Sequence, residues 1–298
     1  MNNPLLAAFS GITSMLGWGS SDFFVKIATT KLHEFAILFW SQIFGAIPLL
    51  IYLIISGNAF NFNISSLPLI LIFALFYGAG YALFYRAISI GNVSSVSPTL
   101  SAYGGGAVLV SVFIFGESLA LSTIIALFVL FVGVILMSID WQDFKKNNNK
   151  LFLAAGIAEA LIALVIFSFW YPLWDSRFID NPDWFSDVIV LRFGMALTFL
   201  MIALISKAKL LPQKGQHKDF SVFKLLLAIG LLDGIGFLAF NLGYGLTDST
   251  SIVTMIGSAY ALPTILLAAI FLKEKLGKQQ IIGATLIILA LIAINLFT

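Results

Sequence analysis

Residues 101–119 read SAYGGGAVLVSVFIFGESL, and residues 258–276 read SAYALPTILLAAIFLKEKL. Both stretches open with Ser-Ala-Tyr, continue as a long apolar run and reach a glutamate, Glu117 or Glu274, after the same number of residues. The shared register continues to Ile124-Ile125 and Ile281-Ile282. Chance agreement between two apolar helices is the alternative explanation, but the shared polar positions argue against it. The sequence therefore predicts that the two halves of the chain are copies of one helical unit.

The composition places nearly the whole chain in lipid. Of 298 residues, 60% are hydrophobic and 10% are charged, whereas about a quarter of the residues of a soluble globular protein are charged. A water-soluble enzyme, a nucleic-acid-binding surface and a disordered tail are therefore excluded. The absence of cysteine excludes disulfides, thiolate metal sites and cysteine nucleophiles. The formal net charge of +2 is too small to imply an acidic partner.

Polar residues divide the chain into apolar runs long enough to cross a membrane, which takes about 20 residues. Ten transmembrane helices are predicted, at residues 5–28, 34–56, 67–88, 93–115, 120–139, 151–171, 185–206, 221–246, 250–272 and 278–297. The polar stretch KKNNNK at residues 145–150 separates the fifth run from the sixth. We expect an all-α integral membrane protein in which residues 1–140 form a first five-helix repeat, residues 141–150 a polar linker and residues 151–298 a second repeat.

The number of spans in each repeat determines how the two repeats face the membrane. Because five is odd, the second copy must enter from the opposite side, which gives two inverted repeats around a central cavity. On the side of both termini the loops carry one basic residue, Arg177, and the other loops carry nearly all the rest. By the positive-inside rule the basic loops are cytoplasmic and both termini lie outside. The expected location is the cell membrane, either plasma or inner, with multiple passes.

Two further motifs carry a resemblance to a known family. Residues 17–26 read GWGSSDFFVK, and Leu262-Pro263-Thr264 precedes LKEKL at residues 272–276. With the repeat, they make the whole chain resemble the drug/metabolite transporter superfamily, in its ten-helix EamA-like branch. The resemblance implies a basket of two five-helix repeats that moves solutes by alternating access, often as an exporter of metabolites or amino acids. Gly106 stands where the second half has Pro263, so we expect a proline bend in one half only.

Three ionisable residues fall within the predicted spans. Glu159 lies near the centre of the sixth span, Asp233 near the centre of the eighth, and Arg192 off the centre of the seventh. Each costs about 2.5 to 3.5 kcal/mol at the bilayer centre if unpaired, so each must be paired, hydrated or neutral. One interpretation is an Arg192–carboxylate bridge that only joins helices. The other interpretation is that the two acids line a transport pathway. The acid without a cationic partner could then bind a proton or a substrate amine, and Arg192 could bind a substrate carboxylate.

Helical spacing groups further residues with these charges. Asp233, Phe237, Phe240 and Tyr244 lie on one stripe of the eighth span, and its counterpart on the third span has Tyr77, where an acid is missing. We therefore expect a chemically lopsided cavity. The predicted substrate- or proton-binding residues are Glu159, Asp233, Arg192, Trp18, Tyr77, Tyr81, Phe237 and Tyr244. Secondary candidates, for which helix contacts are an equal alternative, are Ser14, Ser97, Ser101, Thr254 and Ser258.

Other motifs indicate structure rather than chemistry. Residues 104–106 are three glycines within an apolar span, which favours helix packing over a phosphate loop. Gly230 and Gly234 form a GxxxG packing motif. The two histidines are far apart in loops, so neither a zinc site nor a Ser/His triad is supported. Glu117 and Glu274 are expected to cap helices or to pair with nearby lysines. We expect no cofactor, no metal and no enzymatic activity.

These features predict a secondary transporter that moves a small amphipathic metabolite, an amino acid or a related compound, by alternating access and in the direction of export. No ATP-binding segment is present in the sequence, so coupling to an ion gradient, exchange or downhill flow is expected. A lipid or polyprenyl-carrier flippase, or a sugar or nucleotide-sugar transporter of the same fold, is the alternative. The expected partners are a small-molecule substrate, protons and the lipid bilayer, without nucleic acid. The oligomeric state stays open, with a monomer as one option.

Overall fold

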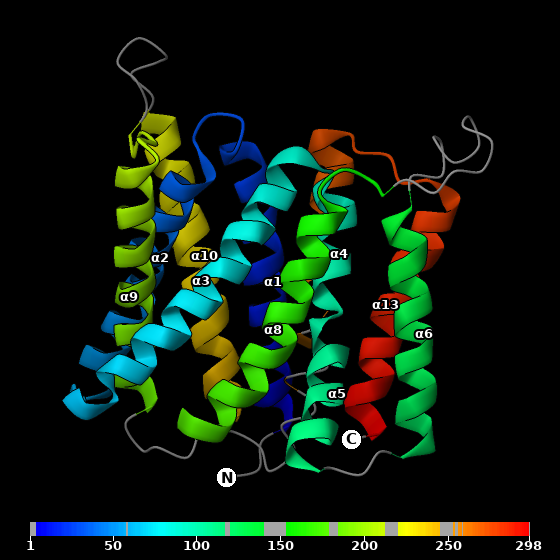
Figure 1. The fold of residues 1–298 in the computed structure, drawn as a ribbon, viewed down its shortest axis with the longest axis horizontal. Coiled ribbons are helices and arrows are strands. Elements are labelled where there is room, and N and C mark those ends of the chain that lie inside the picture. The colour runs from blue at the N-terminus through cyan, green and yellow to red at the C-terminus, as the bar shows by residue number, and fades with distance from the viewer. Residues whose placement is uncertain are drawn as a thin grey trace.

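The computed structural model describes residues 4–57, 59–116, 120–139, 153–178, 184–211, 220–244, 253, 256–257 and 259–297. These residues are helical apart from their connections and one isolated antiparallel bridge between Ile139 and Leu153, which confirms the all-α prediction. The elements of the first half (Figure 1) are α1 (Pro4–Ala28), α2 (Glu34–Ser56), η1 (Ile64–Ser66), α3 (Leu67–Ile90), α4 (Val93–Ser101), α5 (Tyr103–Phe115) and α6 (Leu121–Ser138). Those of the second are α8 (Ile157–Phe178), α9 (Trp184–Ile205), α10 (Phe220–Tyr244), α12 (Ala261–Leu267), η2 (Ala268–Leu272) and α13 (Lys278–Phe297).

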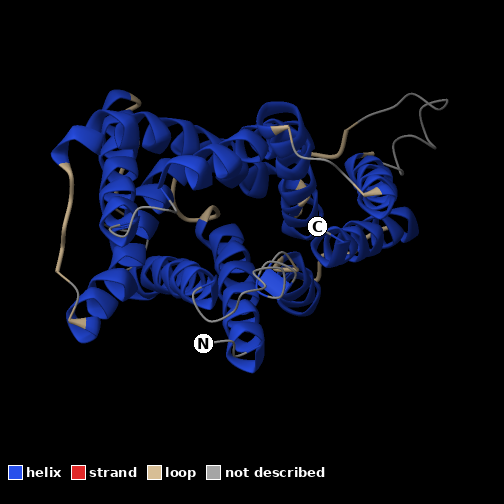
Figure 2. Cartoon of the chain, turned by 90° about the horizontal axis from the view of Figure 1, so that it is seen from below, coloured by secondary structure: helices blue, strands red, loops and turns tan. Residues whose placement is uncertain are grey.

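Length and hydropathy identify a multi-pass membrane protein. Within the described ranges, seven helical segments are long and apolar enough to cross a bilayer: Glu34–Ser56, Ile64–Ile90, Val93–Ile114, Leu121–Ser138, Ile157–Trp174, Phe185–Ile205 and Ser221–Gly243. The segments Ala261–Leu272 and Lys278–Ala293 are apolar but shorter. The helix α1 begins and α13 ends at the same end of the bundle (Figure 1). Seen from below, the helices form a bundle several helices deep (Figure 2).

The sixth predicted span begins later than expected. The helix α8 starts at Ile157, because the chain turns at Gly156, where φ is +81°. A Cβ at Gly156 would overlap the carbonyl oxygen of Ala87, so only glycine allows this close approach to α3. Glu159 therefore lies in the first turn of α8 and not near the centre of a span, which corrects the position predicted from the sequence.

The span predicted at residues 93–115 consists of two helices. A turn at Ala102 separates α4 from α5, and the amides of Gly105 and Gly106 both donate to the carbonyl oxygen of Ala102. In the second half, a turn at Ala259 and Tyr260 precedes α12. Both turns fall on described residues of the repeated Ser-Ala-Tyr, Ala102 in the first half and Ala259 with Tyr260 in the second. The proline bend expected in one half only stays a prediction, because these turns lie at the shared motif and not at Pro263.

Helix packing pairs elements from the two halves. The helix α1 packs against α10 and α3 packs against α8, so the first helix of each half contacts the third helix of the other. The helices α2, α4 and α6 pack against α9, α12 and α13, which hold the corresponding places in the second half. This reciprocal pattern places residues from both halves around the middle of the bundle, with α6 and α13 together at one edge (Figure 1).

Glycines bring α10 close to its neighbours. A Cβ at Gly230 would lie 2.9 Å from the amide nitrogen of Gly45 on α2, and a Cβ at Gly234 would overlap the carbonyl of Gly45. On α1, a Cβ at Gly17 would lie 3.0 Å from the Cα of Gly236. The Gly230–Gly234 motif is thus a packing face, as predicted, and α10 is held between α1 and α2 at the level of Asp233.

A lysine and a glutamate join helix ends at the end of the bundle opposite the termini. The Nζ of Lys26 donates to the carbonyls of Ile88 (2.8 Å), Ser89 (3.3 Å) and Gly91 (2.6 Å). The Glu274 carboxylate accepts from the amides of Val93 and Ser94 and from the Ser94 hydroxyl, and so caps the N-terminus of α4. The predicted capping role of Glu274 is confirmed, whereas Glu117 lies outside the described residues.

Candidate functional site

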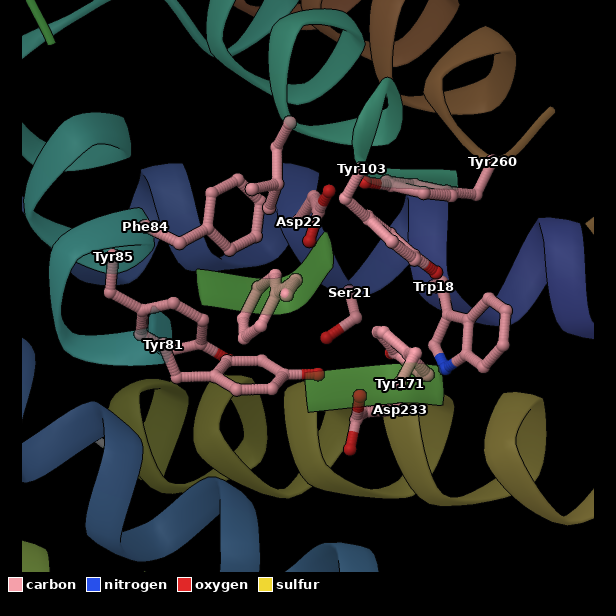
Figure 3. A pocket seen from close by; sticks show the side chains of 12 residues that line it. Trp18, Ser21, Asp22, Tyr81, Phe84, Tyr85, Tyr103, Tyr171, Asp233 and Tyr260 are labelled. Carbon is pink, nitrogen blue, oxygen red and sulfur yellow. The ribbon is translucent and has the colours of Figure 1, made fainter. Parts of the chain in front are cut away.

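A partly open pocket lies between the two halves of the chain. Its empty space is about 470 Å³, a figure that includes the open space at its mouth. The described lining residues come from α1, α3, α4, α5, α8 and α10 and from the turn before α12 (Figure 3). They are Trp18, Ser21, Asp22, Tyr81, Phe84, Tyr85, Leu100, Tyr103, Phe167, Tyr171, Asp233 and Tyr260. Eight of these twelve residues carry aromatic rings and two are carboxylic acids.

The first acid, Asp22, has a hydrogen-bond donor but no cation. Its side chain is on α1 and the residue is 8% exposed. The Ser97 hydroxyl donates to Oδ2 at 2.8 Å, and no donor to Oδ1 is found among the described residues. Lys26 is one helical turn away on α1, but its Nζ is bound to backbone carbonyls at the end of α3. In the part of the chain that the structure describes, Asp22 forms no ion pair.

The second acid, Asp233, is paired. The Nη1 of Arg192 donates to its Oδ2 at 2.8 Å, and the two residues are 6% and 8% exposed. The same Nη1 also donates to Oε1 of Gln42 at 3.4 Å, and the guanidinium lies 5.2 Å from the centre of the Phe237 ring. Arg192 is therefore held behind Asp233, outside the pocket lining, and the buried bridge considered at the sequence level is present.

The aromatic walls are braced by one another. The rings of Tyr103 and Tyr171 stack with centroids 4.7 Å apart, and Trp18 contacts Tyr260 edge-on at 6.3 Å. Tyr77 lies behind the lining, with its hydroxyl 3.0 Å from that of Tyr171 and its ring stacked 3.9 Å from Trp170. Because each ring is supported by another, the walls are preorganised rather than free to collapse into the pocket.

The predicted acid Glu159 does not reach this pocket. Its Oε1 is 3.8 Å from Nε of Arg86, whose side chain is 57% exposed, and Arg86 also lies 3.7 Å from Glu34. Such exposed ion pairs join helix ends and contribute less than about 1 kcal/mol. The sequence placed Glu159 deep in the membrane because it took the sixth span to begin several residues too early.

Of the other predicted residues, Trp18, Tyr81 and Asp233 line the pocket, whereas Phe237 and Tyr77 stand behind it. The hydroxyls of Ser14 and Ser101 bond the carbonyls of Ser10 and Pro98 on their own helices, and Ser97 holds Asp22. Thr254 and Ser258 lie outside the described residues. Tyr244 is the last residue of α10, and its side chain is not among those described.

Sequence reasoning missed Asp22 and four of the five pocket tyrosines, Tyr85, Tyr103, Tyr171 and Tyr260. Asp22 was quoted only as part of a family motif, although it is an acid within a predicted span. Tyr103 and Tyr260 were visible as the tyrosines of the repeated Ser-Ala-Tyr, and both line the pocket. The duplication of this tyrosine in the two halves was the available signal. The described residues contain no cluster of three or more His, Cys, Asp or Glu that could hold a metal ion.

Comparisons with known proteins agree with this architecture. The model of the EamA-like transporter family matches the chain twice, over residues 5–139 and 154–296. A solved structure titled "Crystal structure of protein" is similar to the chain with a TM-score of 0.66 and 16% sequence identity, over 96% of this chain and 95% of that one. At that identity the similarity concerns the fold alone. No curated protein matches the chain.

Proposed function

We propose a specific transport function for this chain, which belongs to the EamA-like transporter family. Members of that family are membrane transporters of small molecules, and the chain is a multi-pass membrane protein. The proposed function is secondary transport of a small amphipathic metabolite with an amine, a class that includes amino acids and related compounds. The observation that carries it is a pocket between the two halves, lined by two carboxylic acids and eight aromatic rings.

The proposed mechanism is alternating access by two inverted five-helix repeats, formed by residues 1–140 and 151–298 and joined by a linker at 141–150. The reciprocal packing of α1 on α10 and of α3 on α8 supports this arrangement, because an internal two-fold axis exchanges these pairs. A pocket bounded by both repeats opens to one side or the other when the repeats rock against each other. The basic loops are proposed to be cytoplasmic, with both termini outside and transport in the direction of export.

Seven of the lining side chains, and Arg192 behind them, have a proposed role. Asp22 and Asp233 bind a substrate amine or a proton, and Arg192 fixes the orientation of the Asp233 carboxylate. Trp18, Tyr81, Tyr103, Tyr171 and Tyr260 form the walls that hold the apolar part of the solute. Glu159 has no part in this proposal, because it pairs with Arg86 away from the pocket.

The lining also argues against the alternative transport classes. A nucleotide sugar or a polyprenyl diphosphate carries a phosphate group, which proteins bind with Arg, Lys or helix N-termini. The described lining residues include neither Arg nor Lys, and their two ionisable acids would repel a phosphate. An amine-bearing solute therefore fits the pocket better than either of these anionic ones.

The test is counterflow in proteoliposomes that contain the purified full chain. Vesicles loaded with an unlabelled amine or amino acid should accumulate the labelled form of the same solute. Asp22→Asn and Asp233→Asn should each reduce the initial rate at least tenfold, whereas the matched variant Glu159→Gln should transport normally. If both pocket variants exchanged solute at the unaltered rate, the binding-site assignment would be wrong. Movement of a labelled lipid with no exchange of water-soluble solute would favour the flippase.

A further inference from the structure

We infer that the pocket selects a compact organic monocation, an alkylammonium whose charged nitrogen lies beside Asp22 and against the aromatic rings, over a zwitterionic amino acid. This inference rests on the proposed transport function and narrows its substrate class. Three features of the pocket support it: its unbalanced charge, its aromatic lining and its small size.

The charge balance of the pocket is negative. Two carboxylic acids line it, and the nearest basic side chains are already bound. Arg192 donates to Asp233 at 2.8 Å, and Lys26 donates to carbonyls at the end of α3. Asp22 keeps one oxygen without a described donor, in a residue that is 8% exposed. Because a buried carboxylate is costly without a partner, a ligand cation beside Asp22 would stabilise its ionised form.

The aromatic rings suit the same kind of ligand. The face of a tyrosine or tryptophan attracts a cation within about 6 Å of the ring centre, and rings that surround an ammonium group recognise it without hydrogen bonds. In Figure 3 the labelled rings surround the space next to Asp22 and Asp233. Several of these rings come from different helices and brace each other, as the stacked pair Tyr103 and Tyr171 shows.

The described lining residues offer no cationic partner to a substrate carboxylate. The sequence left Arg192 open as a partner for a substrate carboxylate, but its Nη1 is bound to Asp233 and Gln42, and Arg192 is not among the described lining residues. A zwitterion would bring its carboxylate into the space beside Asp22, for which the described residues supply no cation. An amine of the same shape without the carboxylate brings no such unpaired charge. Charge selection of this kind arises from disfavouring the wrong ligand as well as from binding the right one.

Size limits the ligand further. The empty space of about 470 Å³ includes the open mouth, so the space between the braced rings is smaller than this figure. A small ammonium group with a short apolar chain fits this space.

The experiment measures binding of matched probes to the purified full chain by titration calorimetry. The amine 3-methylbutylamine, the amino acid leucine and the alcohol 3-methylbutan-1-ol share one branched apolar chain and differ in charge. Tetramethylammonium supplies a cation that cannot donate a hydrogen bond. We expect the amine to bind at least tenfold more tightly than leucine or the alcohol, and tetramethylammonium to compete with it.

Variants then locate the charge that makes the selection. Asp22→Asn should weaken amine binding about 30-fold or more, the lower range for removing one partner of a buried charge pair, and should leave binding of the alcohol unchanged. Asp22→Glu should recover part of the amine affinity, and the matched control Glu159→Gln should bind like the unaltered protein. The inference is overturned if leucine binds as tightly as the amine, or if Asp22→Asn keeps the full preference for the amine.

The probe series on the unaltered protein decides the charge preference even if the Asp22 variants fail to fold. Counterflow separates this inference from the transport function. Exchange of leucine without binding or exchange of the amine would overturn the cation preference and leave the transport function in place. Binding of the amine without exchange of any solute would leave the cation site in place and overturn the transport function.

Discussion

The buried pair formed by Arg192 and Asp233 makes a quantitative prediction about stability. Arg192→Met removes the guanidinium and leaves the Asp233 carboxylate, in a residue that is 8% exposed, with no cation in contact. Gln42 loses a donor at the same time. Breaking a buried ion pair by removing one partner costs about 3 to 5 kcal/mol. Asp233→Leu should cost a similar amount, because it leaves Arg192 buried between α2 and α10.

The double variant Arg192→Met/Asp233→Leu separates this explanation from a general loss of packing. Replacing both charges by apolar side chains of similar volume is often neutral, so the double variant should be more stable than either single variant. The coupling energy of the cycle should then be several kcal/mol, above the range of about 0.3 to 0.5 kcal/mol within which independent changes add.

The assay is thermal unfolding of the detergent-solubilised protein, followed by the fraction that remains monodisperse on size exclusion. A loss of 1 kcal/mol lowers Tm by about 2 to 4 °C in chains of 150 to 250 residues. Each single variant should therefore lose about 6 °C or more, and the double variant clearly less. If the loss of Tm in the double variant equalled the sum of the losses in the two single variants, the coupling energy between Arg192 and Asp233 would be zero. That result would refute the reasoning.

Three further predictions concern neighbouring features. Gly45→Ala should lower the free energy of unfolding by about 1 to 3 kcal/mol, since its Cβ would lie 2.6 Å from Nη1 of Arg192 on α9. The control variant Gly78→Ala meets only ordinary contacts. Equal Tm values for the two variants would contradict the close approach of α2 to Arg192. Glu274→Ala removes the cap of α4 and should lower the free energy of unfolding by about 1 kcal/mol. Amide hydrogen exchange at Ser94 should become faster. Unchanged exchange at Ser94 would show that the cap does not form. Glu159→Gln should lower stability by less than about 1 kcal/mol in the same unfolding assay, and a loss of several kcal/mol would place Glu159 in a buried pair.

The positions of the helices were predictable because each run of about 20 apolar residues ends at polar residues. The bounds of α2 agree with the prediction, and α9 is shifted by one residue at each end. The start of α8 was not predictable, because it depends on Gly156 turning against the carbonyl of Ala87, which is distant in sequence. The turn at the Ser-Ala-Tyr motif was also not predicted. The motif was identified as a repeat, and its backbone geometry was not considered.

In the candidate site, the pairing of charged residues buried in apolar spans was predictable from the sequence. An arginine and an aspartate in neighbouring apolar spans must find partners, and Arg192 and Asp233 pair as one of the two sequence interpretations required. Asp22 was quoted only within the motif at residues 17–26, and the spacing of Asp22 and Lys26, i to i+4 on a helix, would allow a local ion pair. The tertiary structure overrides that spacing, because Lys26 satisfies three carbonyls at the end of α3 instead.

The lopsided cavity expected from the sequence takes a different form in the structure. The first half does supply an acid, but from α1 rather than from α3, the counterpart of α10. Since α1 and α10 pack together, Asp22 and Asp233 are carried by one pair of helices, while α3 and α8 supply Tyr81, Tyr85, Phe84, Phe167 and Tyr171. The two helix pairs that an internal two-fold axis would exchange thus carry different chemistry. A bound amine should consequently have one preferred orientation, with its nitrogen toward α1 and α10 and its apolar chain toward α3 and α8.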